Sequence, residues 1–278
     1  MAAGFRSSEV PVIIRQNMHV HTWLSLCAKE GMTLARIAAE AEAAGLEVIG
    51  ISDHMDEPDW MRERVILRSR WILQDVETPV RFLMGSEVTA LGPGVFALSE
   101  ETAEALDYVA VSCDHYHLEA TENPTDRSPA GYARHYLQML EGALNFPWTD
   151  LISHPWGLTK VRVDHAFRRE AMALYDRGEI ARLLALAAER EIAFEMKPPV
   201  AAAFPEFFAE IVESGRAAGV RFSLGSDAHQ PHEVGYGGPE HMAEAVSTLD
   251  AIGLREDDLF DPDTALRRRG RLEQAGTA

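Results

Sequence analysis

The sequence predicts an α/β fold in which a barrel of parallel strands is surrounded by helices. Two observations carry this expectation: seven short apolar segments alternate with helical patterns, and no linker rich in Gly, Ser or Pro divides the 278 residues. This alternation favours a parallel sheet with helical crossovers, and the length suits one closed barrel domain over residues 1–278. A doubly wound open sheet is the alternative, but the chain lacks a glycine-rich dinucleotide fingerprint and a phosphate-binding loop.

The expected strands are short runs of β-branched and aliphatic residues that stop at polar residues. The first leads from the apolar run at 12–14 to the His19-Val20-His21 stretch. The other six are expected at 46–51, 79–84, 108–112, 150–153, 192–197 and 220–224.

Helices are expected between these strands. They are predicted at 33–44, 57–76, 130–144, 177–189, 205–218 and 239–248, with a small helix after the Gly-Pro-Gly loop at 92–94. Thr33 is placed to cap the first helix, and Gly45 to end it. We expect a loose N-terminal arm over residues 1–9, a long loop before the helix at 177–189, and a polar tail over 262–278.

Composition excludes some classes of function. No apolar run approaches the about 18 residues that a transmembrane helix needs, and the N-terminus has no signal-peptide core. With only Cys27 and Cys113, the chain has no disulfide framework. We therefore expect a cytoplasmic enzyme without a membrane partner.

The formal net charge of −18 argues against binding to a long nucleic acid, which needs a basic surface. A small anionic substrate stays compatible with this charge, because bound metal ions invert the field locally. Short charge runs usually mark solvated chain ends. That is the expectation for the one basic cluster, Arg267, Arg268, Arg269 and Arg271.

Histidines and carboxylates gather where the predicted strands end. The set is His19, His21, His54, Glu87, His115, His117, His154, Asp227 and His229, with seven of the eleven histidines of the chain. In a parallel barrel these positions meet at the carboxyl ends of the strands. Imidazoles with a few carboxylates suit zinc, manganese or iron, and more than four ligands imply more than one ion. Glu87 is the natural bridge between two ions.

Clustered cations favour hydrolysis. They lower the pKa of a bound water and stabilise the attacking and leaving oxygens of an in-line displacement. Hydrolysis of a phosphate ester by a metal-bridging hydroxide benefits most from this arrangement. Hydrolysis of a carboxylic ester, lactone or amide fits the same residues and is the alternative reaction. A non-catalytic metal-binding regulatory module is a third hypothesis.

Six short motifs occur in a fixed order. They are His-x-His-Thr at 19–22, Ser-Asp-His at 52–54, Gly-Ser-Glu at 85–87, a histidine after the fourth strand, His-Pro at 154–155 and Gly-Ser-Asp-Ala-His at 225–229. This ordered set resembles the PHP (polymerase and histidinol phosphatase) superfamily over about residues 12–230. The resemblance implies a distorted (β/α)7 barrel that carries two or three divalent ions.

The resemblance also implies ligand sets. One ion would take His19, His21, Glu87 and Asp227, a second Glu87, His115 and His154, and a third His54, His229 and Cys27. At the Cys27 position relatives often have histidine or an acidic residue. A thiolate binds zinc well, so Cys27 is either a ligand or a buried hydrophobic residue.

Two further departures from the family pattern concern strand ends. The fourth strand ends with one extra residue, so either His115 or His117 is the ligand; we prefer His115, with His117 free to act as an acid or to contact substrate. After the sixth strand, Glu195-Met196-Lys197 stands where relatives often have Glu-x-Asn.

Candidates for substrate binding and for proton transfer complete the predicted site. Lys197, Lys160, Arg162 and His117 are the candidates for binding substrate, and Asp227, His229 and His117 are the candidates for protonating the leaving group. The sequence thus predicts a metal-dependent phosphatase that acts on a small phosphate ester, of which histidinol phosphate is the best-known family example.

Overall fold

Seven parallel strands form the barrel in the computed structural model, which describes residues 12–158, 161 and 164–272. In their order around the sheet they are β1 (Gln16–Val20), β2 (Val48–Ile51), β4 (Arg81–Gly92), β6 (Tyr108–Ser112), β7 (Leu151–Ser153), β8 (Ala193–Met196) and β9 (Phe222–Leu224). Two short strands, β3 (His54–Met55) and β5 (Val95–Phe96), pair with β4. Each of the seven predicted strands is present.

The barrel closes where its first strand meets the end of its last strand. Val20 and Ala228 form a parallel bridge, in which the His21 N–H donates to the Ala228 carbonyl and the Ala228 N–H donates to the His19 carbonyl, at 3.0 and 3.1 Å. An open doubly wound sheet has no such contact between its outer strands. The predicted barrel is therefore confirmed, in a nearly closed form.

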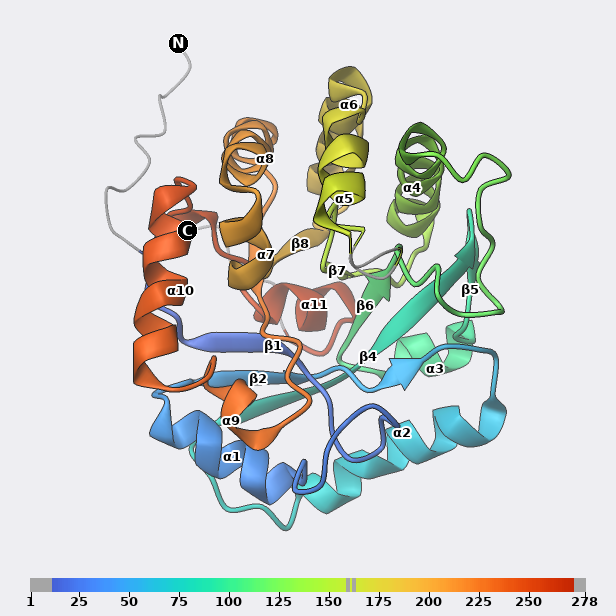
Figure 1. The fold of residues 1–278 in the computed structure, drawn as a ribbon. Coiled ribbons are helices and arrows are strands. Elements are labelled where there is room, and N and C mark those ends of the chain that lie inside the picture. Colours follow the sequence, from blue (N-terminus) through green and yellow to red (C-terminus); the bar gives the residue numbers. More distant parts are fainter. Residues whose placement is uncertain (1–11, 159–160, 162–163, 273–278) are drawn as a thin grey trace.

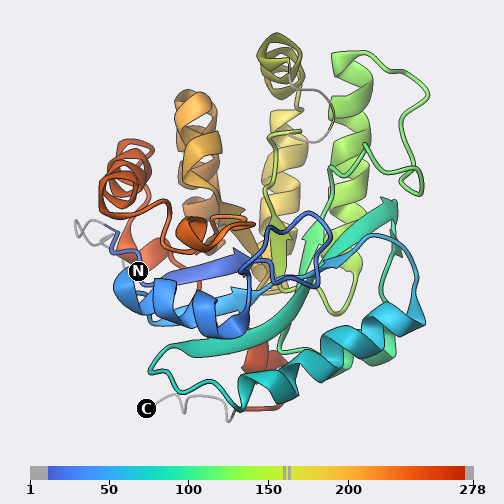
Figure 2. The ribbon, with the colours of Figure 1, turned by 60° about the horizontal axis from the view of Figure 1, so that its bottom comes forward.

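Helices cover the outside of the strands (Figures 1 and 2). They are α1 (Leu34–Ala43), α2 (Trp60–Leu73), α3 (Glu100–Ala105), α4 (Pro129–Asn145), α5 (His165–Ala173), α6 (Arg177–Glu189), α7 (Pro198–Ala203), α8 (Pro205–Ala218), α9 (Pro231–Val234), α10 (Pro239–Ala251), the 3₁₀ turn η1 (Glu256–Asp258) and α11 (Asp263–Arg268). Within the described residues, none of the helices is both long enough and apolar enough to cross a bilayer.

Local signals explain where the first helix begins and ends. The Thr33 hydroxyl accepts a hydrogen bond from the Arg36 N–H, as an N-cap does, and Gly45 follows the helix with φ of +71°. The prediction for this helix is confirmed. Two other predictions were wrong at this level: α5 lies in the segment expected to be a loop, and the first strand begins at Gln16 rather than in the apolar run before it.

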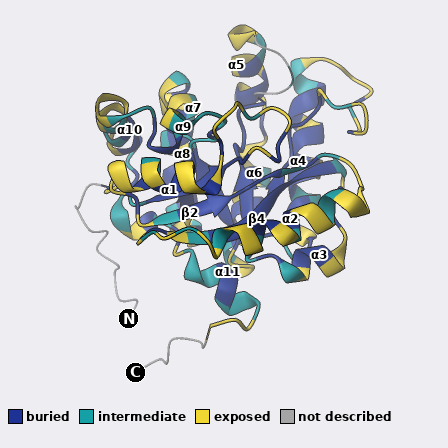
Figure 3. Cartoon of the chain, turned by 90° about the horizontal axis from the view of Figure 1, so that it is seen from below, coloured by how far each residue is buried: buried dark blue, intermediate teal, exposed yellow. Residues whose placement is uncertain are grey.

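Burial follows the layers of the barrel (Figure 3). The main apolar core lies between the strands and the surrounding helices. A smaller core closes the amino end of the barrel, where Phe260 and Leu266 pack against Met18, Leu83 and Tyr108. The last described elements therefore cover one end of the barrel and leave the carboxyl ends of the strands for the site.

The C-terminal arginines are not a solvated chain end, so that prediction was wrong. Arg268 and Arg269 form ion pairs with the fully buried Asp150, at 2.9 and 2.7 Å. Arg271 pairs with Asp107 at 2.7 Å, and Arg267 with an aspartate of its own turn. Three of the four arginines thus meet carboxylates just before β6 and β7, the half-buried Asp107 and the buried Asp150, which only the tertiary structure brings to them.

Candidate metal centre

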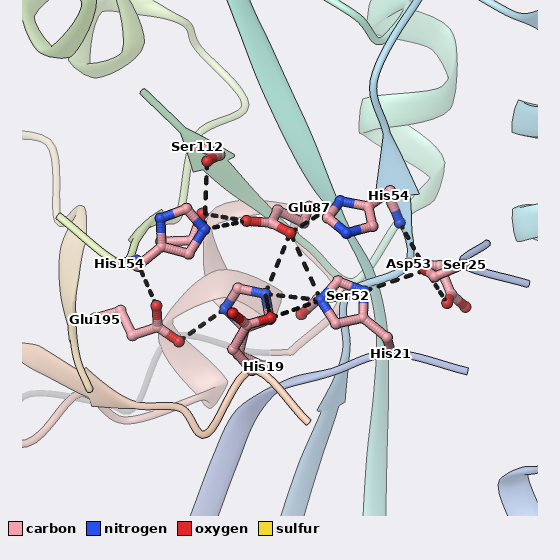
Figure 4. Close-up of polar contacts among 12 residues, drawn as sticks. His19, His21, Ser25, Ser52, Asp53, His54, Glu87, Ser112, His154 and Glu195 are labelled. Carbon is pink, nitrogen blue, oxygen red and sulfur yellow. Dashed lines mark hydrogen bonds and ion pairs between the residues drawn. The ribbon is translucent and has the colours of Figure 1, made fainter. Parts of the chain in front are cut away.

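The carboxyl ends of the strands surround one buried carboxylate, that of Glu87 on β4, with imidazoles (Figure 4). Its Oε2 atom lies 3.1 Å from His54 Nδ1 and 3.3 Å from His19 Nε2. Its Oε1 atom lies 2.7 Å from His154 Nε2 and 3.6 Å from His115 Nε2. The two oxygens of this side chain face two different groups of imidazoles, which suits a carboxylate shared between two cations.

The first group joins β1 and β4 to the segment after β9. His19 Nε2 and His21 Nε2 lie 3.1 Å apart, and Asp227 Oδ1 lies 3.1 Å from His21 Nε2 and 3.5 Å from His19 Nε2. Ligand atoms that are about 2.1 Å from one ion lie about 3.0–3.4 Å apart in octahedral or tetrahedral geometry. The observed separations are close to this spacing, so the group can hold a divalent cation.

The second group contains one of the two histidines that follow β6. Glu87, His115 and His154 place their ligand atoms within 4.8 Å of one another. His115 is buried, whereas His117 is exposed and meets the His115 ring edge-on at a centroid distance of 5.4 Å. The geometry therefore favours His115 as the member of the cluster, in line with our preference.

The third group is built from His21, His54 and His229, whose ligand atoms also lie within 4.8 Å of one another. Cys27 is exposed beside them, which excludes the buried hydrophobic residue considered from the sequence. Partial burial alone would raise the pKa of the Cys27 thiol, but hydrogen bonds with His229 and His54 lower it to about 6. A thiol with this pKa is readily available as a thiolate ligand.

Hydrogen bonds and one ion pair on the outer side of the cluster orient its imidazoles. The Nδ1 contacts are His19 with Glu195 Oε1 at 2.8 Å, His115 with Thr89 Oγ1 at 2.8 Å, His154 with Asp114 Oδ1 at 2.9 Å and His229 with the Asp227 carbonyl at 2.8 Å. An Nδ1–H that donates outward leaves the Nε2 lone pair directed inward, which is the tautomer a metal ligand needs.

Several buried atoms of the cluster are without a hydrogen-bond partner in the described part of the chain. They include Glu87 Oε2, His54 Nδ1 and His115 Nε2. Buried polar atoms are almost always satisfied, and an uncompensated one destabilises the fold. Bound cations would satisfy these atoms, so the donor set fits the metal ions that the resemblance implies.

Charges inside the cluster depend on one another. Burial opposes the charged imidazole of His54, but the Glu87 carboxylate raises its pKa to about 10. Burial likewise opposes charge on His154, whose pKa Asp114 and Glu87 raise to about 10. The imidazoles of His19, His54 and His154 help to hold the pKa of Glu87 well below its usual range despite its burial. The pKa of His19 is likewise raised, whereas burial dominates at His21 and lowers its pKa to about 3. Protons on the imidazoles with raised pKa thus balance Glu87 when no cation does.

Lys197 lies beside the first group. Its Nζ donates to Asp227 Oδ2 at 2.6 Å, while Asp227 Oδ1 faces His21. Burial would raise the pKa of Asp227, but Lys197 and His19 hold it well below its usual range. Asp227 is therefore an ionised carboxylate with one oxygen directed into the cluster.

The cluster opens into a pocket of about 410 Å³ on the side of His54 and His229. The wall of this pocket also carries the imidazoles of His115 and His117 and the thiol of Cys27. The carboxylates Asp56, Glu57 and Asp59 and the guanidinium of Arg62 complete the wall. Asp56 Oδ1 lies 3.6 Å from both His54 Nδ1 and His115 Nδ1, so this carboxylate adjoins the cluster.

The structure brings together the nine residues predicted as ligands. Lys160 and Arg162 lie outside the described residues. Sequence reasoning missed Asp114 and Thr89 as orienting residues, and noted Glu195 only as part of a family motif. The position of Glu195 at the end of the sixth strand was the sequence feature that could have identified it as an orienting residue. Arg62 was missed as a residue of the pocket wall, because it lies inside a helix away from every motif.

Seven parallel strands with this cluster at their carboxyl ends form a barrel with a candidate metal centre. No protein-family model matches the chain. The chain is 28% identical over 257 residues to a probable histidinol-phosphatase of Deinococcus radiodurans, covering 85% of this chain and 93% of the relative. This similarity to a probable histidinol-phosphatase agrees with the resemblance seen in the motifs.

The fold is also found in a solved structure. Histidinol phosphate phosphatase of Lactococcus lactis, solved with zinc, L-histidinol and phosphate, matches with a TM-score of 0.55 and 18% identity over 87% of this chain and 94% of its own. N-isopropylammelide isopropylaminohydrolase of Burkholderia multivorans matches with a TM-score of 0.43 and 19% identity, over 86% of this chain and 60% of its own.

Proposed function

We propose that this protein is a metal-dependent phosphatase that hydrolyses a small phosphate monoester. The observation that carries the proposal is the buried Glu87 carboxylate, whose two oxygens face separate groups of inward-directed imidazoles. The sequence relationship to a probable histidinol-phosphatase supports the same activity. A cytoplasmic location stays a prediction.

The proposed ligand sets are those that the resemblance implies. His19, His21, Glu87 and Asp227 would hold one ion, Glu87, His115 and His154 a second, and His54, His229 and Cys27 a third. Divalent ions bound there would activate water and neutralise the phosphoryl oxygens. The outward hydrogen bonds of Glu195 and Thr89 would keep the imidazoles in the tautomer that this needs.

Other side chains would serve the proton transfers. Asp227 is ionised by its ion pair with Lys197, so it suits the roles of ligand and base better than that of acid. His117 lies on the pocket wall at the rim of the cluster, where an imidazolium could protonate the leaving alkoxide. His229 is the second candidate for this role, because it lines the same pocket.

The pocket suggests the kind of leaving group. Glu57 and Asp59 are exposed carboxylates on its wall, whereas Asp56 lies 3.6 Å from His54 and His115. Exposed carboxylates beside a phosphate site favour a substrate that carries a positive charge on its alcohol portion. The proposed substrate is therefore the phosphate ester of an amino alcohol, a class that includes histidinol phosphate.

The experiment is metal analysis combined with a substrate panel. Purified protein and Cys27→Ala are reconstituted with Mn²⁺ or Zn²⁺, and bound metal is measured per chain. About three ions in the parent and about two in Cys27→Ala would support the third site. Turnover is then assayed with histidinol phosphate, phosphate esters without an amine, and carboxylic esters and lactones. Failure to retain any metal, or turnover of carboxylic esters alone, would contradict the proposal.

A further inference from the structure

Helix α2 begins beside the metal cluster and directs one arginine to it. The Asp59 carboxylate caps the helix by accepting from the Met61 and Arg62 N–H groups, at 2.9 and 3.3 Å. Three residues into the capped turn, the Arg62 Nε donates to the backbone carbonyl of His54 at 3.1 Å. This bond holds the guanidinium next to a proposed metal ligand, on the wall of the pocket into which the cluster opens.

The terminal nitrogens of Arg62 have no hydrogen-bond or ion-pair partner among the described residues. On the same helix, by contrast, Arg70 Nη2 is paired with Asp107 Oδ1 at 2.5 Å. Lys197, the other cation near the cluster, is already bound to Asp227 and lines a different cavity. Of the described lysines and arginines, Arg62 alone lines the pocket of the cluster.

We propose that Arg62 binds the non-bridging oxygens of the substrate phosphate and so positions the ester over the metal cluster. This inference rests on the proposed phosphatase function and adds a specificity residue to it. A guanidinium presents paired N–H donors in the geometry that two phosphate oxygens accept. The surrounding carboxylates would repel an anion, so a permanent positive charge at this point separates a phosphate ester from an uncharged ester.

The placement of Arg62 also explains how a chain with a net charge of −18 can admit an anion. The ions would neutralise the imidazole-lined part of the pocket, while the exposed Glu57 and Asp59 add negative charge to its wall. Arg62 adjoins the imidazole-lined part, because its Nε is held by the backbone of His54. The phosphate end and the cationic end of an amino-alcohol ester would thereby be oriented in opposite directions.

The test compares Arg62→Gln and Arg62→Lys with a control on the same helix, Arg68→Gln, whose side chain is exposed. Each protein is loaded with Mn²⁺, its metal content is measured, and inorganic phosphate is titrated by calorimetry. KM and kcat are measured with histidinol phosphate. We expect Arg62→Gln to weaken phosphate binding and to raise KM by about tenfold or more, with unchanged metal content. Arg62→Lys should recover part of the loss, and Arg68→Gln should match the parent.

Equal phosphate affinity in Arg62→Gln and the parent would overturn the inference, as would loss of metal from Arg62→Gln, which would show that Arg62 only supports His54. A failure of the proposed function would be distinguishable from a failure of this inference. If the parent hydrolyses no phosphate ester but still binds phosphate more tightly than Arg62→Gln, Arg62 is an anion-binding residue of a protein with a different reaction.

Discussion

The two ends of the barrel each bury a carboxylate, and they neutralise it in different ways. At the amino end, Asp150 is paired with Arg268 and Arg269, which the chain itself supplies. At the carboxyl end, Glu87 is surrounded by imidazoles, and protons or ions from solution have to balance its charge. A buried charge balanced by the chain contributes to the fold, whereas one left for an external cation marks a site of chemistry.

The largest expected effect comes from removing the charge at the carboxyl end. Glu87→Gln keeps the shape of the side chain but loses the carboxylate that faces both groups of imidazoles. We expect bound metal to fall and kcat/KM to drop by about 10³-fold or more, because the amide cannot serve two cations. Metal analysis and steady-state kinetics measure both effects. Parent-like activity in this variant would contradict the central role of Glu87.

Asp150→Asn tests the amino end. The substitution leaves Arg268 and Arg269 without their buried partner, and we expect the free energy of unfolding to fall by about 3 kcal/mol. Urea denaturation measures the loss, and metal content should not change. The control is Arg267→Ala, since the Arg267–Asp261 pair is largely exposed and should contribute less than about 1 kcal/mol. A loss of metal in Asp150→Asn would show that the two ends are not independent.

Glu195→Gln tests a carboxylate at the carboxyl end of the barrel that orients a proposed ligand without being one. Glu195 Oε1 lies 2.8 Å from His19 Nδ1, and its other oxygen accepts from the His154 N–H. Without the negative charge, His19 becomes a weaker ligand, and we expect metal affinity to fall about 10- to 100-fold. Competition with a chromophoric chelator measures this affinity. Glu206→Gln, exposed on α8, is the control, and an equal loss there would rule out a specific role for Glu195.

The smallest expected effect concerns the two cysteines. In metal-stripped protein, Cys27 should react with iodoacetamide at a rate that rises with pH and is half-maximal near pH 6, because its lowered pKa makes it a thiolate above that value. Bound metal should protect it. Cys113 is the internal control: it is buried, burial raises its pKa, and it should stay unmodified. Mass spectrometry of the labelled peptides separates the two, and a midpoint above pH 8 for Cys27 would contradict its contact with His54 and His229.

Much of the carboxyl end could be predicted from the sequence because parallel strands impose a simple rule. A residue that ends one strand meets the residues that end its neighbours, so Glu87 and His154 could be placed together without knowing any side-chain conformation. The pairing of His19 with Glu195 follows the same rule, but it depends on rotamers that a linear pattern does not specify. Arg62 follows no strand, and only the position of α2 beside His54 brings it to the pocket.

The amino end was much less predictable. Arg268 and Arg269 form a short charged run, which looks the same in sequence whether it is solvated or folded against a carboxylate. Asp150 lies more than a hundred residues earlier, and no periodicity links the two. The short helix α11 and the helix α5 were missed for a related reason, since tertiary contacts rather than local pattern stabilise short helices.

The bridge between Val20 and Ala228 has a consequence for biosynthesis. The proposed first metal ion would lie across this bridge, because His19 and His21 come from the first strand and Asp227 from the segment after the last. A nascent chain leaving the ribosome carries the two histidines long before it carries the aspartate. The proposed ligand set is completed only after nearly the whole barrel has been synthesised, so a nascent chain that stops before Asp227 would lack one side of the proposed centre.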